Sequence, residues 1–177
     1  MRAFTLAARH ELIGLYGVVE RNWYLVKRYA WWELAFFVWT IANTLSIVFI
    51  AKGVGAPPDV QNELATKLLI GGVIWAYLGI IFEILTETVS WERWEGTIEY
   101  TFMAPLSRPI HLFGMGLFAV AYGVVRASLL FAVIAAFFSL HLPDANFASA
   151  LVLLAIASVS FAPYSIAIAV TPRMCAM

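Results

Sequence analysis

The feature that most constrains this chain is a series of long apolar stretches separated by short charged segments. Each stretch reaches or exceeds the roughly 17–25 residues that a helix needs to cross the hydrocarbon core of a bilayer. We therefore predict an all-α, polytopic membrane helix bundle that forms a single transmembrane domain. The four expected spans are residues 34–51, 68–85, 111–140 and 147–170, with a loop at 52–67 and a tight turn at 141–144. We expect Asn43 and Ser46 of the first span to face another helix, and Gly72 with Ala76 to permit a close helix contact in the second.

Composition supports a membrane protein and excludes several other classes. The chain is 63% hydrophobic and 12% charged, whereas soluble domains are about 45–50% apolar and about 25% charged. The single cysteine, Cys175, has no partner within the chain for a disulfide. Zinc and haem spacings and the phosphate-binding loop G-x-x-x-x-G-K-(S/T) are all absent from the sequence. We expect no bound cofactor and no nucleic-acid partner.

Residues 1–30 have the pattern of a helix lying at a membrane surface. Their apolar side chains repeat at spacings of three and four, which places Leu12, Tyr16, Val19, Trp23 and Val26 on one helical face. Basic residues project from roughly the opposite side, as in interfacial helices. The alternative is a loose basic leader. A cleavable signal peptide is not expected, because charged residues continue up to the first span.

The segment 91–108 is the most charged part of the second half of the chain. Glu92, Glu95 and Glu99 are three and four residues apart, so a helix would align them as one acidic stripe. An apolar stripe runs beside it and consists of Trp91, Trp94, Ile98 and Phe102.

Two prolines, Pro105 and Pro109, prevent one helix from running straight through this segment. The sequence therefore predicts a short amphipathic helix between the second and third spans. Gly96 allows the backbone to turn just before this helix, and Thr97 is placed to cap it.

The run Glu95-Gly96-Thr97-Ile98-Glu99, followed by Met103-Ala104-Pro105-Leu106-Ser107-Arg108, resembles the cytoplasmic loop of type-2 ATP-binding-cassette (ABC) permeases. In that family an E-x-G-T-(L/I)-E run leads to a small-residue-Pro-x-Ser-Arg segment, after which a long span begins. The resemblance extends more loosely over the whole chain, through hydropathy and the order of elements.

This resemblance implies a permease subunit, with the family tendency toward export, that pairs with a second permease subunit as a homo- or heterodimer. A separate cytoplasmic ABC ATPase would supply the energy for transport and would bind the segment 91–108. The residues implied in that contact are Glu92, Trp94, Glu95, Gly96, Thr97, Ile98, Glu99 and Pro105. The family normally has six spans, and this chain supplies four, so we expect the isolated chain to lack transport activity.

Polar residues within the spans are the remaining candidates for function. A charge at Arg126, near the middle of the third span, costs at least ~2.5 kcal/mol if it faces lipid. We expect it to reach toward Glu83 or Glu87, at the end of the second span. The alternative is that its long side chain reaches the interface unaided. Small residues at Ala119, Gly123 and Ala127 predict a helix-packing stripe on the same span.

Lysine and arginine predict the orientation in the membrane, since they concentrate in cytoplasmic segments. The region before the first span, the segment 91–108 and the tail after the last span hold most of them: Arg2, Arg9, Arg21, Lys27, Arg28, Arg93, Arg108 and Arg173. Both termini and the segment 91–108 should therefore be cytoplasmic in a multi-pass protein of the cell membrane.

Two other classes of function remain as alternatives. One is a non-transporting membrane assembly or regulatory protein. The other is an intramembrane enzyme that would use Ser128 or Ser160 with His141, although no glycine-flanked serine motif accompanies them. We expect no enzymatic activity.

Overall fold

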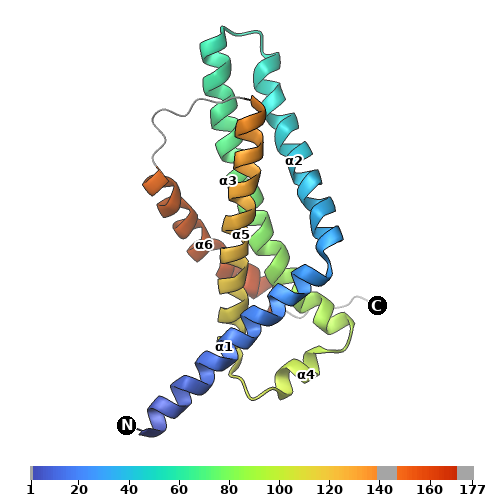
Figure 1. Ribbon diagram of the computed structural model, residues 1–177, viewed down its shortest axis with the longest axis vertical. Coiled ribbons are helices and arrows are strands. Elements are labelled where there is room, and N and C mark those ends of the chain that lie inside the picture. Colours follow the sequence, from blue (N-terminus) through green and yellow to red (C-terminus); the bar gives the residue numbers. More distant parts are fainter. Residues whose placement is uncertain (1, 139–146, 171–177) are drawn as a thin grey trace. The chain divides into compact units, whose positions relative to one another are not determined.

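A computed structural model describes residues 2–138 and 147–170 of the chain (Figure 1). This part of the chain consists of helices and contains no strand. The helices are α1 (Arg2–Arg28), α2 (Ala30–Gly53), α3 (Pro58–Trp94), α4 (Ile98–Met103), α5 (Arg108–Phe138) and α6 (Phe147–Val170). The predicted all-α class is confirmed.

Apolar helices of bilayer length confirm the membrane-protein character of the chain. Among the described residues, α2, α3 and α5 are long and apolar enough to cross a membrane, and α6 contains a shorter apolar stretch, Val152–Ile168. Helix α6 has the bounds predicted for the fourth span and contains Pro163. The turn predicted at 141–144 lies outside the described residues.

The chain divides into two compact units. Among the described residues, unit 1 consists of residues 2–28, 80–121 and 158–170, and unit 2 consists of residues 29–79, 122–138 and 147–157. Helices α3, α5 and α6 therefore each contribute to both units.

In unit 2, α2 and the first half of α3 lie side by side, joined by a short connection (Figure 1). The second half of α5 completes the core around them, which consists of the buried residues Val48, Ala51, Ala65, Leu69, Leu130 and Ile134. Gly72 allows a close approach, because a Cβ atom there would lie 3.0 Å from Cγ2 of Thr44. The expected role of Gly72 in helix packing is confirmed.

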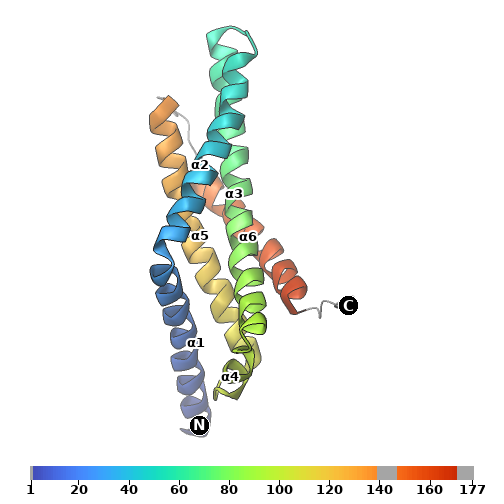
Figure 2. The same ribbon diagram turned by 90° about the vertical axis from the view of Figure 1, so that its right-hand side faces the viewer.

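In unit 1, α1 packs along the first half of α5 (Figure 2). A Cβ atom at Gly114 would lie 3.0 Å from Val18 and 3.2 Å from Leu15, so glycine permits this contact. Val18 and Asn22 are buried on the inner face of α1. Tyr16 on the predicted apolar face points outward and is exposed, as are Leu12 and Trp23.

Two expectations about the helices are wrong. The interval 52–67, predicted to be a loop, is helical from Pro58 onward, because proline suits the first turn of a helix and Glu63 pairs with Lys67 one turn later. Asn43 and Ser46, expected to face another helix, are both exposed. The inner face of α2 carries Thr44 and Val48 instead.

Candidate partner-binding site

The segment 91–108 begins at the carboxyl end of α3. The Gly96 N–H donates to the carbonyl of Arg93 at 3.3 Å, and the Thr97 N–H donates to the carbonyl of Glu92 at 2.9 Å. This pair of hydrogen bonds is the Schellman arrangement that ends helices, and it requires a left-handed residue. Gly96 supplies that conformation with φ of +70°. The predicted turn at Gly96 is confirmed.

The predicted single amphipathic helix is wrong in its extent. Helix α3 continues to Trp94, and α4 covers only Ile98–Met103. Thr97 occupies the N-cap position but makes no side-chain capping hydrogen bond. Its Oγ1 atom lies 3.4 Å from the Glu92 carbonyl, which already accepts the Thr97 N–H. The hydroxyl therefore supports the end of α3 and does not cap α4.

The turn also breaks the expected acidic stripe. Glu92 is only 4% exposed and forms an ion pair with Arg21 of α1. Glu95 and Glu99, beyond the end of α3, are exposed. Glu92 thus has a structural role, because a buried charge needs a partner. Glu95 and Glu99 are exposed and remain available to another molecule.

Apolar side chains accompany the two exposed carboxylates. Trp94 is 80% exposed, and its ring meets that of Trp91 edge to face with 5.3 Å between the centroids. Tyr100 and Met103 of α4 are also exposed. Exposed aromatic residues beside charges are typical of surfaces that bind proteins or membrane headgroups.

Helix α4 ends at Ala104 because a proline follows. Ala104 is extended, with φ of −62° and ψ of 141°, as expected for a residue before proline. Pro105 is exposed in the connection to α5. Pro109 falls in the first turn of α5, where its missing N–H is tolerated. The predicted interruption at the two prolines is confirmed.

Helix α1 contacts both ends of this segment. At the start, Arg21 pairs with Glu92. At the end, the Ser107 hydroxyl donates to Oε2 of Glu11 at 3.0 Å. Leu106 lies against Gly14, where a Cβ atom would come within 2.3 Å of its Cδ1. We refer to residues 91–108, which include both of these contacts, as the coupling segment.

Unit 2 contains a separate polar cluster. Oε2 of Glu33 accepts hydrogen bonds from Nη1 of Arg126 and from the hydroxyl of Tyr122, each at 2.9 Å. The Arg126 guanidinium also lies 6.0 Å from the centre of the Phe37 ring. The Arg126 side chain is 8% exposed and that of Glu33 is 26% exposed.

The structure identifies an ion-pair partner of Arg126 that was not predicted. The expected contact with Glu83 or Glu87 stays a prediction, because those residues belong to unit 1 and Arg126 to unit 2. Glu83 is half-buried and Glu87 exposed on α3, and the carboxylate that pairs with Arg126 is Glu33. Because Glu33 follows Trp31 and Trp32 at the start of a span, the sequence did not distinguish it from a carboxylate that simply lies at the membrane interface. The cost of an unpaired charge within a span predicted that Arg126 has a carboxylate partner. It did not identify which carboxylate that is.

The small-residue stripe of α5 is confirmed as buried, because Ala119, Gly123 and Ala127 all face inward. Ser128, considered for catalysis, donates to the carbonyl of Val124 in its own helix at 2.7 Å. Within residues 2–138 and 147–170, no group of three or more His, Cys, Asp or Glu side chains is arranged to hold a metal ion.

Comparison of the chain with models of protein families, with curated protein sequences and with solved structures finds no match.

Proposed function

We propose that this chain is a transmembrane permease subunit of an ABC transporter, of the exporting kind, driven by a separate cytoplasmic ATPase that binds the coupling segment. The observation that carries the proposal is the combination of exposed Trp94, Glu95 and Glu99 with a backbone fixed by Gly96 and by α1. The resemblance of the sequence 95–108 to the cytoplasmic loop of type-2 ABC permeases supports the same assignment.

In this proposal the two exposed carboxylates meet basic side chains of the ATPase, which favours fast and specific association. Trp94 enters an apolar pocket of the partner, where its loss would cost ~1–3 kcal/mol. The coupling segment connects α3 to α5. When ATP binding moves the partner surface, the segment carries that motion into both helices.

The contacts with α1 suit such a role. A segment that transmits motion has to move as one piece, and Glu92 and Ser107 are each tied to α1 by a polar contact. The ATPase would therefore displace α1 together with the coupling segment. A second permease subunit completes the translocation path, and the N-terminus, the coupling segment and the C-terminus lie on the cytoplasmic side.

Co-purification of the ATPase tests this proposal. We expect Glu95→Gln/Glu99→Gln and Trp94→Ala each to reduce recovery of an ABC ATPase from native membranes, the first with a smaller dependence on salt. Glu63→Gln is the matched control, because it removes an exposed carboxylate from the other end of α3.

Equal recovery of the ATPase with all variants, at low and moderate salt, would refute the coupling role. Recovery of membrane proteins without any ATPase would instead favour an assembly or regulatory protein.

A further inference from the structure

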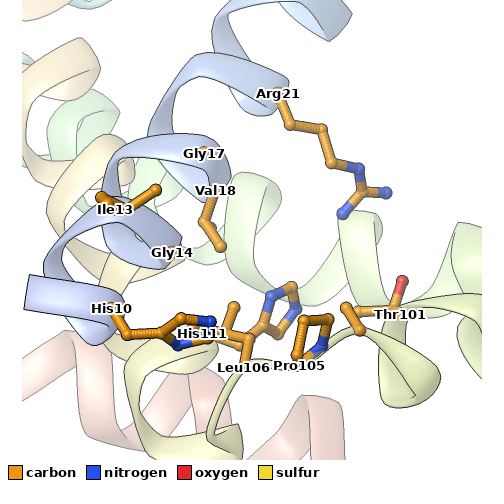
Figure 3. Close-up of a pocket in the computed structure, with 11 residues that line it drawn as sticks. His10, Ile13, Gly14, Gly17, Val18, Arg21, Thr101, Pro105, Leu106 and His111 are labelled. Atoms are coloured by element: carbon orange, nitrogen blue, oxygen red, sulfur yellow. The ribbon is translucent and has the colours of Figure 1, made fainter. Parts of the chain in front are cut away.

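A cavity of about 340 Å³ lies within unit 1, between α1, the coupling segment and the first turn of α5 (Figure 3). This volume falls within the range of about 300–1,000 Å³ that is usual for ligand pockets. The α1 side chains His10, Ile13 and Arg21 line one side, and Leu106 and His111 line the other. Several of these residues are partly or fully exposed, so the cavity is open to the surface.

The lining combines apolar walls with basic groups. Ile13, Val18, Pro105 and Leu106 supply the apolar surface, and the titratable side chains are two imidazoles and one guanidinium. No lining residue is acidic. The cavity therefore suits a ligand with an anionic group attached to an apolar body.

Two carboxylates that contact residues beside the cavity have partners of their own. Glu92 pairs with Nη1 of Arg21, and Glu11 accepts a hydrogen bond from Ser107. A guanidinium has five N–H donors, so the ion pair leaves others available. The Arg21 side chain is 39% exposed, and it extends from α1 toward Thr101 on the opposite side of the cavity (Figure 3). Each imidazole adds an N–H donor even when it is neutral.

Glycines shape the cavity in two different ways. At Gly14, a Cβ atom would collide with Leu106, so this glycine closes α1 against the coupling segment. At Gly17, one turn further along α1, a Cβ atom would meet nothing within 4 Å. Gly17 therefore borders open space, and a larger side chain there would extend into the cavity.

The neighbouring face of α1 indicates where the ligand comes from. Leu12, Tyr16 and Trp23 are exposed, and a helix with such a face lies at the boundary between lipid headgroups and acyl chains. At this depth, the abundant molecules with an anion on an apolar body are phospholipids.

We propose that this cavity binds the phosphate-bearing end of an anionic membrane phospholipid. His10 and His111 donate to the phosphate, Arg21 attracts its negative charge from the Thr101 side of the cavity (Figure 3), and the glycerol and first acyl carbons lie against Ile13 and Leu106. The proposal goes beyond ATPase coupling and does not depend on it, because it requires only that unit 1 lies at a membrane surface.

Lipid retention by the purified chain tests this site without any ATPase present. The protein is reconstituted in phosphatidylcholine with a minority of phosphatidylglycerol, extracted in mild detergent, and examined by native mass spectrometry for bound lipid. We expect the wild type to retain phosphatidylglycerol preferentially. We expect roughly tenfold weaker retention in Gly17→Leu and in His10→Ala/His111→Ala, as when a charge-assisted hydrogen bond is lost.

Two controls separate the cavity from general attraction to anionic lipid. Gly116→Leu makes the same change on α5, at a glycine that also borders open space and does not line the cavity. Lys27→Gln removes an exposed charge from α1 outside the cavity. Both should retain the lipid as the wild type does. Circular dichroism verifies that each variant keeps its helices.

Three results would overturn the proposal. Equal retention by the wild type and both cavity variants would show that the lipid does not occupy the cavity. Equal retention of phosphatidylcholine and phosphatidylglycerol would contradict the role of the basic groups. Displacement of the lipid by inorganic phosphate alone, at comparable concentration, would show that the site binds a free anion and not an amphiphile.

Discussion

Arg126 is a buried charge within unit 2, where its guanidinium pairs with the carboxylate of Glu33. Its position in an apolar span predicted a buried charge with a carboxylate partner, and the structure places it in that state. The identity of the partner depends on which helices are neighbours. Glu33 is 93 residues away in sequence, and hydropathy contains no information about such pairing.

The first prediction concerns this ion pair. Removing one member of a buried pair leaves the other charge without compensation, whereas removing both does not. We expect Glu33→Gln to destabilise the protein more than Arg126→Gln does, because the remaining arginine is the less exposed of the two groups. The double variant should be less destabilised than the sum of the two single variants, with a coupling of about 1–3 kcal/mol.

Reversible unfolding in detergent, analysed as a double-mutant cycle, measures this coupling. The exposed pair Glu63–Lys67 provides the control and should show no resolved coupling, since both side chains are largely in solvent. Additive effects of Glu33→Gln and Arg126→Gln would contradict the contact.

The second prediction concerns Gly96. Its φ of +70° is a conformation that other residues adopt at a cost of about 1–2 kcal/mol. Gly96→Ala should therefore lower the free energy of unfolding by about that amount and weaken ATPase binding. Gly71→Ala is the control, because Gly71 lies inside α3 beside open space, where alanine favours the helix. A loss of stability in Gly71→Ala equal to that in Gly96→Ala would contradict this account.

At the scale of elements, hydropathy predicted the apolar stretches better than the ends of the helices. The fourth span matches α6 in both bounds. The second span, 68–85, is only the middle of α3, which extends from Pro58 to Trp94. Hydropathy identifies the residues that can lie in the hydrocarbon core of a bilayer. The ends of helices depend instead on proline, glycine and capping hydrogen bonds. The turn at Gly96 thus separates α3 from α4 in a segment whose periodicity predicted one helix.

The third prediction concerns the attachment of α1. Glu92 is buried and Arg21 is its charged partner, so Arg21→Gln should loosen α1 from the end of α3. We expect faster hydrogen exchange in residues 9–28 of this variant. The charge exchange Arg21→Glu/Glu92→Arg should restore much of the protection. Lys27→Gln, at an exposed position of the same helix, should leave exchange unchanged. Unchanged exchange in Arg21→Gln would contradict the attachment.

At the scale of the whole molecule, the fold class followed from the sequence, whereas only part of the candidate site did. Exposure of Glu95 and Trp94 agrees with a binding surface. Burial of Glu92 does not agree with a role in such a surface. The sequence could not predict this burial, because it depends on where α1 packs. The cavity beside Gly17 was missed for the same reason, since its residues come from α1, the coupling segment and α5.

If a cytoplasmic ABC ATPase binds the coupling segment, a photoreactive group placed there should cross-link to it in native membranes. A photoreactive amino acid replaces Trp94, and in a second variant it replaces Trp75, which is 76% exposed in the apolar part of α3. We expect an ABC ATPase in the covalent products from position 94 and none from position 75. Cross-linking of the ATPase from position 75, or products from position 94 that contain no ATPase, would contradict this binding.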